Sequence, residues 1–191
     1  MPGLSEDDVD PDPVKQFLSW YGKAGTDAVT LVTASVDAVP SGRIVLLKGV
    51  DHRGFVFHTN YESAKARDLA ANPRAALVFF WPPNRQVRVN GTVAMVGREE
   101  SERYWRTRPR ASQLGAWASQ QSEVIESRAV LEGRLAELSA RFDGAVPCPP
   151  FWGGYRLMPD VIEFWHHRDD RLHDRLRYRR EATWILDRLS P

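Results

Sequence analysis

The sequence predicts an α+β fold, an antiparallel β-barrel with peripheral helices, in one domain. A succession of short segments is rich in β-branched and aromatic residues, and clusters of Gly, Pro, Asn and Asp separate several of them. Helical patterns are inserted between these segments, a combination typical of an antiparallel barrel that carries helices. With 191 residues, 42% of them apolar and 27% charged, the chain is long enough for one well-packed domain.

The first residues differ in composition from the rest. Residues 1–11 are acidic and contain Pro and Gly, which predicts a disordered leader followed by a single domain over 12–191. Asp12 precedes a proline, a pair typical of a helix start, and this helix is expected to end at Gly22 or Gly25.

The expected strands share alternating polarity, or apolar runs bounded by turn residues. They cover residues 28–36, 43–48, 55–59, 75–81, 86–96, 155–158, 161–167, 171–179 and 183–189. The first three are expected to form an antiparallel meander, with residues 40–42 as a turn. The apolar run within 43–48 predicts a buried strand whose charged ends reach a rim.

Helical patterns are expected over residues 63–72, 99–108, 112–119 and 123–142. Lys65 lies in the first turn of its helix, where the helix dipole favours anions, so it is either a phosphate ligand or an ordinary exposed lysine. Leu131, Leu135, Leu138 and Phe142 form an apolar stripe on the last helix, which indicates either core packing or a subunit contact.

Charge and cysteine content narrow the class of protein. The formal net charge is +1, which indicates no general attraction to nucleic acid or to an anionic membrane. No segment is apolar enough to span a bilayer, and the acidic N-terminus is unlike a secretion signal. The single cysteine, Cys148, allows no disulfide within the chain. We expect a cytoplasmic protein that binds neither nucleic acid nor membrane.

Basic side chains recur near the C-terminus. On a strand over 171–179, Arg171, His173 and Arg175 would share one face, which suits a bound anion. The alternative is a solvated edge strand neutralised by neighbouring aspartates.

Other chemistries find less support in the sequence. His166 and His167 face opposite sides of a strand, and no carboxylate stands at ligand spacing, so no metal site is expected. No Gly-x-Ser-x-Gly or glycine-rich nucleotide loop is present. The remaining cationic groups suit a ligand with two phosphates, or two ligands with one each; they are Arg43, Lys48, Lys65, Arg108, Arg171 and Arg175.

An ordered set of short motifs covers residues 28–191. The motifs are Arg43-Ile-Val-Leu-Leu-Lys48, Thr59-Asn60, Ser63-x-Lys65, Asn72-Pro73, Gln86-Val87, Arg108-Pro-Arg-x-Ser112, Gly115-Ala-Trp-Ala-Ser-x-Gln-Ser122, Trp152-Gly-Gly154, Glu163-Phe-Trp165 and Arg171-Leu-His-Asp-Arg175. In these motifs the chain resembles the pyridoxine (pyridoxamine) 5′-phosphate oxidase family, flavoenzymes that use FMN and O2 to make pyridoxal 5′-phosphate. The resemblance implies an antiparallel split β-barrel and a homodimer with FMN at the subunit interface.

The resemblance also implies a role for each matching residue. The FMN contacts would be Arg43, Ile44, Val45, Leu46, Leu47, Lys48, His58, Thr59, Lys65, Gln86, Gln121, Ser122, Trp165 and Arg175. The contacts to a phosphorylated substrate would be Lys48, Tyr104, Arg108, Ser112, Arg171 and His173. Arg171 and His173 would be the catalytic pair, which holds the substrate ring against the flavin.

Two positions depart from the family pattern. His58 stands where the family usually has Tyr, and Ala64 stands where an Arg usually precedes Lys65, which predicts weaker FMN retention. Two other readings stay open: a related FMN-dependent oxidase of a reduced aromatic metabolite, as in phenazine biosynthesis, and a flavin-binding protein without turnover.

Overall fold

The computed structural model describes residues 3–191, and within them the predicted barrel is confirmed. Eight strands form one antiparallel sheet in the order β3-β2-β1-β4-β5-β6-β7-β8, and an additional pairing of β3 with β6 closes the first six into a ring. The strands are β1 (Ala28–Ala34), β2 (Pro40–Asp51), β3 (Gly54–Asn60), β4 (Arg74–Trp81), β5 (Arg85–Met95), β6 (Trp152–His166), β7 (Asp174–Arg180) and β8 (Trp184–Arg188).

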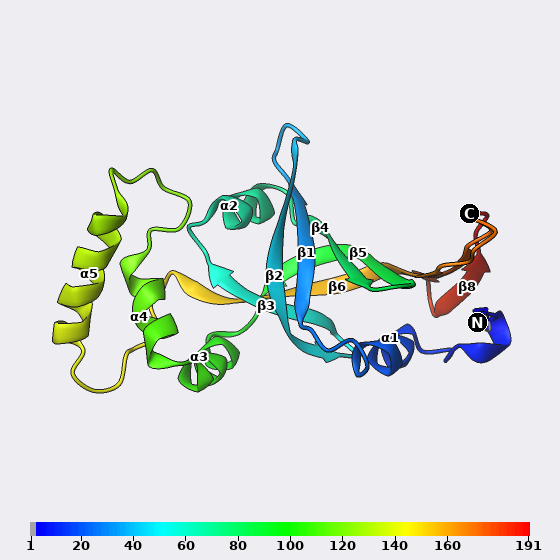
Figure 1. Ribbon diagram of the computed structural model, residues 1–191, viewed down its shortest axis with the longest axis horizontal. Coiled ribbons are helices and arrows are strands. Elements are labelled where there is room, and N and C mark those ends of the chain that lie inside the picture. Colours follow the sequence, from blue (N-terminus) through cyan, green and yellow to red (C-terminus); the bar gives the residue numbers. More distant parts are fainter. Residues whose placement is uncertain (1–2) are drawn as a thin grey trace.

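The long strand β6 closes the barrel because its two halves have different partners. Its first half pairs with β3, from Asn60 opposite Trp152 to Phe55 opposite Leu157. Its second half pairs with β7, while β5 lies along its other edge. The hairpin β7–β8 therefore extends beyond the ring, toward the end of the molecule where both chain ends lie (Figure 1).

The helices in the described part of the chain gather at different ends of the barrel. They are η1 (Glu6–Asp8), α1 (Pro13–Tyr21), α2 (Ala64–Ala71), α3 (Arg98–Thr107), α4 (Arg110–Ala118) and α5 (Arg128–Arg141). Figure 1 shows α3, α4 and α5 at one end and α1 at the other, near β8. No helix within residues 3–191 is long and apolar enough to cross a membrane.

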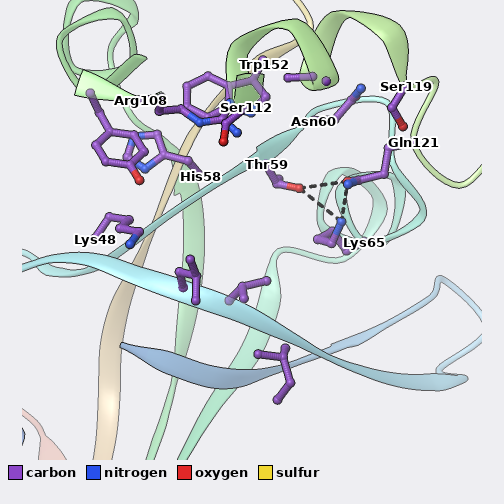
Figure 2. A pocket seen from close by; sticks show the side chains of 16 residues that line it. Lys48, His58, Thr59, Asn60, Lys65, Arg108, Ser112, Ser119, Gln121 and Trp152 are labelled. Atoms are coloured by element: carbon purple, nitrogen blue, oxygen red, sulfur yellow. Dashed lines mark hydrogen bonds between the residues drawn. The ribbon is translucent and has the colours of Figure 1, made fainter. Parts of the chain in front are cut away.

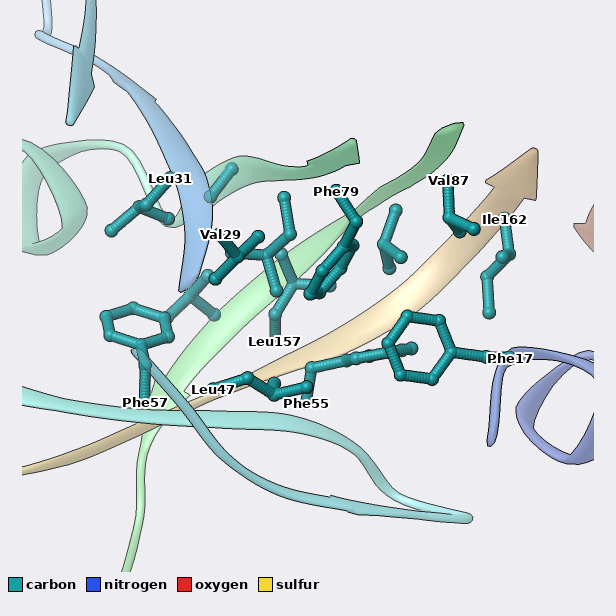
Figure 3. Close-up of a cluster of buried hydrophobic side chains, with 14 of the residues drawn as sticks. Phe17, Val29, Leu31, Leu47, Phe55, Phe57, Phe79, Val87, Leu157 and Ile162 are labelled. Carbon is teal, nitrogen blue, oxygen red and sulfur yellow. The ribbon is translucent and has the colours of Figure 1, made fainter. Parts of the chain in front are cut away.

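Helix α1 begins as predicted and closes one end of the core. The Asp12 side chain accepts a hydrogen bond from the Val14 N–H at 2.9 Å, which caps the helix. Phe17 is fully buried and makes edge contacts with Phe55 and Phe79, each at 4.9 Å between ring centroids (Figure 3). Burial of one such ring contributes about 2 kcal/mol or more, which fixes α1 on the barrel.

A second apolar cluster attaches the other helices to β6. Trp105 of α3 meets Trp152 edge-on at 4.9 Å, and its indole N–H donates to the Val146 carbonyl at 2.8 Å. Leu138 and Phe142 pack partly on this cluster. No residue of helix α5 is fully buried, so core packing holds only for the end of the stripe, at Leu138 and Phe142, and the subunit contact stays a prediction.

Several strand predictions are corrected. Residues 155–158 and 161–166 belong to the single strand β6, because Pro159 lies at an irregularity in the pairing with β5, where a missing N–H is tolerated. The strand ends before His167. The turn expected at 40–42 lies at 35–39, where Ala38 has a φ of 61°, and Pro40 is the first residue of β2.

The run within 43–48 is not a buried strand. Leu47 is 3% exposed, whereas Ile44 and Leu46 on the opposite face are 63% and 47% exposed. Alternation places only one side of β2 against the core, and the other side faces outward.

The C-terminal strand begins later than predicted. Residues 171–173 form a turn before β7, and Arg171 has a φ of 67°, so Arg171, His173 and Arg175 do not share a strand face. The helix expected over 123–142 likewise begins only at Arg128.

The N-terminal segment is ordered, which corrects the predicted leader for residues 3–11. Leu4 is 8% exposed, residues 6–8 form η1, and the Tyr178 hydroxyl donates to the Asp10 carbonyl at 2.7 Å. Residues 1–2 of that prediction lie outside the described residues. Arg188 of β8 pairs with Glu6, a long-range effect that composition does not reveal.

Candidate functional site

A cavity of about 450 Å³ opens between β2, β3 and the helices α3 and α4. Figure 2 shows Lys48, His58 and Arg108 on one side and Lys65 with Thr59 and Gln121 on the other. The lining residues are Ile44, Val45, Leu46, Lys48, His58, Thr59, Asn60, Lys65, Tyr104, Arg108, Ser112, Gly115, Ala116, Ser119, Gln121 and Trp152.

One end of the cavity is organised by Lys65, in the first turn of α2. Its ammonium donates to Gln121 at 2.8 Å and to the hydroxyls of Thr59 and Ser63, each at 3.1 Å. Burial, and then the charge of Arg43, lower the pKa of Lys65 to about 8. Ser122 accepts from the Ala64 N–H at 3.1 Å, so side chains of the loop after α4 meet the start of α2.

Arg43 lies behind this end rather than in the cavity lining. Its guanidinium donates to Thr33 at 2.6 Å and lies 3.8 Å from the Asp68 carboxylate. It therefore adds positive potential at Lys65 without occupying the cavity.

The other end of the cavity combines aromatic rings with two cations. Lys48 pairs with Asp27, and the Arg108 guanidinium lies over the Trp152 ring at 4.7 Å. One terminal nitrogen of Arg108 is buried and has no hydrogen-bond partner within the described residues. A buried guanidinium with an unused donor is costly unless an anion completes it, so this end fits an anionic group.

His58 stacks against two aromatic rings at this end. Its ring centroid lies 4.1 Å from that of Tyr104 and 5.3 Å from that of Trp152. Burial, followed by the charges of Arg108 and Lys48, lowers the pKa of His58 to about 4. The imidazole is therefore neutral near pH 7, and the positive charge at this end comes from Arg108 and Lys48.

The cavity thus has two cationic ends and an apolar wall. Ile44 and Leu46 project from β2 along this wall, which explains why these apolar side chains are exposed to solvent. An arrangement of this kind suits a planar ligand with a phosphate at Lys65, and a second anion at Arg108.

A second group of predicted site residues lies elsewhere in the molecule. Trp165 and His173 are neighbours, with ring centroids 4.8 Å apart, and Gln86 is opposite Trp165 in the β5–β6 ladder. Arg175 donates to the buried Glu163 carboxylate at 2.9 Å. This group lies toward β7 and β8, away from α3 and α4 at the opposite end (Figure 1).

The structure therefore divides the predicted site into two parts. Eleven of the predicted residues line the cavity: Ile44, Val45, Leu46, Lys48, His58, Thr59, Lys65, Tyr104, Arg108, Ser112 and Gln121. Eight do not: Arg43, Leu47, Gln86, Ser122, Trp165, Arg171, His173 and Arg175. Leu47 points into the core instead, where it is 3% exposed.

Sequence reasoning missed the role of Trp152 in the cavity. Its ring supports both His58 and Arg108, and it stands in the Trp-Gly-Gly motif that the sequence analysis quoted without a function. Asn60 and Ser119 also line the cavity. Both lie within the quoted motifs, but nothing in the sequence indicated a role for either residue.

A closed antiparallel barrel beside a cavity with two cationic ends has the architecture and charge that suit a protein for phosphorylated ligands. Residues 14–142 match the family described as pyridoxamine 5′-phosphate oxidase. Residues 152–191 match the pyridoxine 5′-phosphate oxidase C-terminal dimerisation region. The chain belongs to the pyridoxine/pyridoxamine 5′-phosphate oxidase family, and the predicted family and enzyme class, an oxidoreductase, are confirmed.

Individual relatives agree with this assignment. The pyridoxine/pyridoxamine 5′-phosphate oxidase of Rubrobacter xylanophilus is 57% identical over 99% of this chain and 91% of that protein. The enzyme of the same name from Burkholderia orbicola is 53% identical over 98% of this chain and 93% of its own length.

Solved structures confirm the split-barrel fold. PhzG from Burkholderia lata, in complex with tetrahydrophenazine-1-carboxylic acid, superposes with a TM-score of 0.92 at 32% identity, covering 98% of both chains. A pyridoxamine 5′-phosphate oxidase-related, FMN-binding protein from Nostoc punctiforme has a TM-score of 0.73 at 16% identity over 94% of this chain and 95% of its own.

Proposed function

We propose that this chain is an FMN-dependent oxidase that converts pyridoxine 5′-phosphate or pyridoxamine 5′-phosphate to pyridoxal 5′-phosphate, with O2 as the electron acceptor. The observation that carries the proposal is the cavity with an anion-binding group at each end, one built on Lys65 and one on Arg108. The 57% identity to a protein with this name supports the same substrates.

The Lys65 end would hold the FMN phosphate. Lys65 and the hydroxyls of Thr59 and Ser122 offer charge-assisted and neutral donors around the first turn of α2, where the helix dipole also favours an anion. Ile44 and Leu46 would contact the flavin ring. When bound, FMN supplies the hydride acceptor, and O2 reoxidises it.

The Arg108 end would hold the substrate phosphate. Lys48, Tyr104, Arg108 and Ser112 line this end, and the unused Arg108 donor gives the phosphate a partner. Fixing the phosphate here places the substrate ring near the apolar wall of the cavity, where the flavin would lie.

Two copies of the chain would complete each site. None of Arg171, His173, Trp165 and Arg175 lines the cavity of its own chain. Trp165 lies at the end of β6 and Arg175 on β7, and β7 and β8 lie away from α3 and α4 (Figure 1). In a homodimer these four residues would meet the cavity of the other copy, with FMN at the interface. The match of residues 152–191 to a dimerisation region supports this arrangement.

His173 has a defined role in this proposal. Its Nδ1 accepts the Arg168 backbone N–H at 3.1 Å, so the neutral imidazole carries its proton on Nε2. His173 would therefore donate a hydrogen bond to the substrate and orient it, together with the Arg171 guanidinium.

The test is anaerobic reduction of the bound flavin. FMN-loaded protein mixed with pyridoxine 5′-phosphate or pyridoxamine 5′-phosphate is expected to lose oxidised-flavin absorbance, and admitting air should restore it with formation of pyridoxal 5′-phosphate. Absence of bleaching in protein that contains FMN would contradict the substrate assignment. Bleaching by a reduced aromatic acid instead would favour the phenazine-type alternative. The structural similarity to PhzG is the reason to test this alternative.

The variant Arg108→Ala separates an oxidase from a flavin-binding protein without turnover. We expect its KM for the phosphorylated substrate to rise about 10- to 100-fold, because a charge-assisted contact is lost, while FMN affinity changes little. Equal loss of substrate and FMN binding would indicate a structural role for Arg108.

A further inference from the structure

The N-terminal segment is tied to the C-terminal hairpin by one ion-pair network. Arg188 of β8 donates to both carboxylate oxygens of Glu6, at 2.8 and 2.7 Å, and to the Leu4 carbonyl at 3.0 Å. The same guanidinium donates to Asp174 at 3.0 Å. The segment is therefore held by its backbone as well as by its side chains.

Asp174 is the centre of this network. One of its carboxylate oxygens accepts from Arg188, and the other accepts from the Leu4 N–H at 3.0 Å and from Arg168 at 3.3 Å. Its side chain is only 13% exposed. Burial alone would raise the pKa of Asp174, but the donors from Leu4, Arg188 and Arg168 outweigh it and lower the pKa below its ordinary value.

The network closes the turn that carries Arg171 and His173. Arg168 begins this turn and Asp174 ends it, so their ion pair joins its two ends. The Arg168 backbone N–H also donates to His173 Nδ1 at 3.1 Å. Gly3 packs against the same pair, since a Cβ there would lie 2.2 Å from an Arg168 nitrogen.

The turn contains one residue, Arg171, with a strained backbone conformation. Arg171 has a φ of 67°, in the left-handed region that a residue with a side chain rarely adopts. Inside the turn, the Arg171 N–H donates to the Arg168 carbonyl at 3.2 Å and the Leu172 N–H donates to Asp170 at 3.0 Å. A strained backbone conformation persists only where the surrounding structure holds it in place. Asp174 connects the structure around Arg171 to the N-terminal segment.

We propose that Asp174 is a positioning residue, which uses the docked N-terminal segment and Arg188 as a clamp to hold Arg171 and His173 in their working orientation. The inference rests on the proposed function, because that function assigns Arg171 and His173 to the substrate. The clamp itself is a property of the folded chain and can be tested without turnover.

The first experiment measures hydrogen exchange of residues 167–173 in the FMN-loaded protein. In Asp174→Asn the amide keeps one acceptor oxygen and turns an NH2 group toward the arginines, so exchange in this turn should be about tenfold faster. Glu6→Gln, which weakens only the exposed part of the clamp, should give a smaller increase of about threefold in the same peptide.

Asp187→Asn is the matched control. Asp187 lies on the same hairpin and accepts from two arginines, Arg177 and Arg179, each at 2.9 Å. Within residues 3–191, its ion pairs are with these two arginines and not with the turn or the N-terminal segment. Its exchange in residues 167–173 should equal that of the wild type. Wild-type exchange in both Asp174→Asn and Glu6→Gln, or the same acceleration in Asp187→Asn, would overturn the clamp.

The second experiment tests whether the clamp is needed for efficient turnover. In Asp174→Asn, kcat should fall about tenfold while KM changes less than about twofold, because the phosphate contacts at Arg108 are untouched and only the orientation of the reacting groups is lost. Faster exchange with an unchanged kcat would refute the positioning role. If even the wild type fails to turn over, the proposed function fails, and the exchange comparison still decides whether the clamp exists.

Discussion

His58 shows how one buried side chain can shape the charge of a site without carrying charge itself. Neither ring nitrogen has a hydrogen-bond partner within residues 3–191, and the ring is held by stacking alone. Gly154 makes this position possible, since a Cβ there would approach His58 Nε2 to 3.0 Å. Burial of the ring, and then the nearby charges of Arg108 and Lys48, disfavour the protonated form, so the neutral form is favoured.

The low pKa of His58 predicts a loss of stability in mild acid. The unfolded chain takes up a proton near pH 6.5 but the folded chain only near pH 4, so the free energy of unfolding falls as pH drops between these values. Allowing for partial exposure of the ring, the loss from pH 7 to pH 5 is about 1 kcal/mol. Urea unfolding at both pH values should show this extra loss in the wild type and not in His58→Phe. Equal losses in the two proteins would contradict the assignment.

At the scale of one element, helix α2 is arranged around a cation at its N-terminal end. Ser63 is the N-cap residue, and its hydroxyl accepts from Lys65 rather than capping the helix. Gln121 and Thr59 complete the set of acceptors around the ammonium. These acceptors hold the Lys65 ammonium in place before any ligand binds. Because position 64 is alanine rather than arginine, Lys65 is the cation of the first turn that lies nearest to the cavity.

The pKa of Lys65 predicts a pH-dependent affinity for FMN. Because Lys65 loses its charge above about pH 8, the Kd for FMN should rise about tenfold between pH 7 and pH 9. Flavin fluorescence titrations measure this slope. Lys65→Arg stays charged over the whole range, so its Kd should be flat with pH, whereas the exposed control Lys23→Arg should keep the wild-type slope. A wild-type Kd that does not change would remove Lys65 from the phosphate site.

At the scale of the whole molecule, the two parts of the site lie at opposite ends of the barrel. The cavity lies beside α3 and α4, whereas Trp165 and the turn at Arg171 lie toward β7 and β8 (Figure 1). A single copy therefore carries two half-sites that do not meet. In the proposed symmetric dimer, each half-site would lie against the complementary half of the other copy.

Mixed dimers test this arrangement. At substrate concentrations well below the wild-type KM, Arg108→Ala and Arg171→Ala should each retain about a tenth or less of wild-type activity, because each damages one half of every site. Co-expressed, they should recover about a quarter of wild-type activity, since half of the dimers are mixed and each mixed dimer has one intact site. If both halves acted within one chain, every site would remain defective and no activity would return. Purified mixed dimers with two distinguishable tags should reach about half of wild-type activity.

The local features of the fold could be predicted from the sequence. Asp12 caps α1, Ser63 precedes α2, and the first three strands form the expected antiparallel meander, because these features depend on residues a few positions apart. Ordered motifs were sufficient to predict the family and most of the residues that line the cavity. Lys65 was found because a lysine is unusual in the first turn of a helix, and Arg108 because it stands in one of these motifs.

Only the tertiary structure decided how these pieces are joined. The pairing of β3 with β6 that closes the barrel, the division of the site into two halves, and the docking of Glu6 on Arg188 all join residues far apart in the chain. Each depends on which distant charge or strand edge is available, and local propensity contains no such information. The turn at Arg171 was misread as a strand for the same reason: its conformation is supported by Asp174 and the N-terminal segment, not by its own sequence.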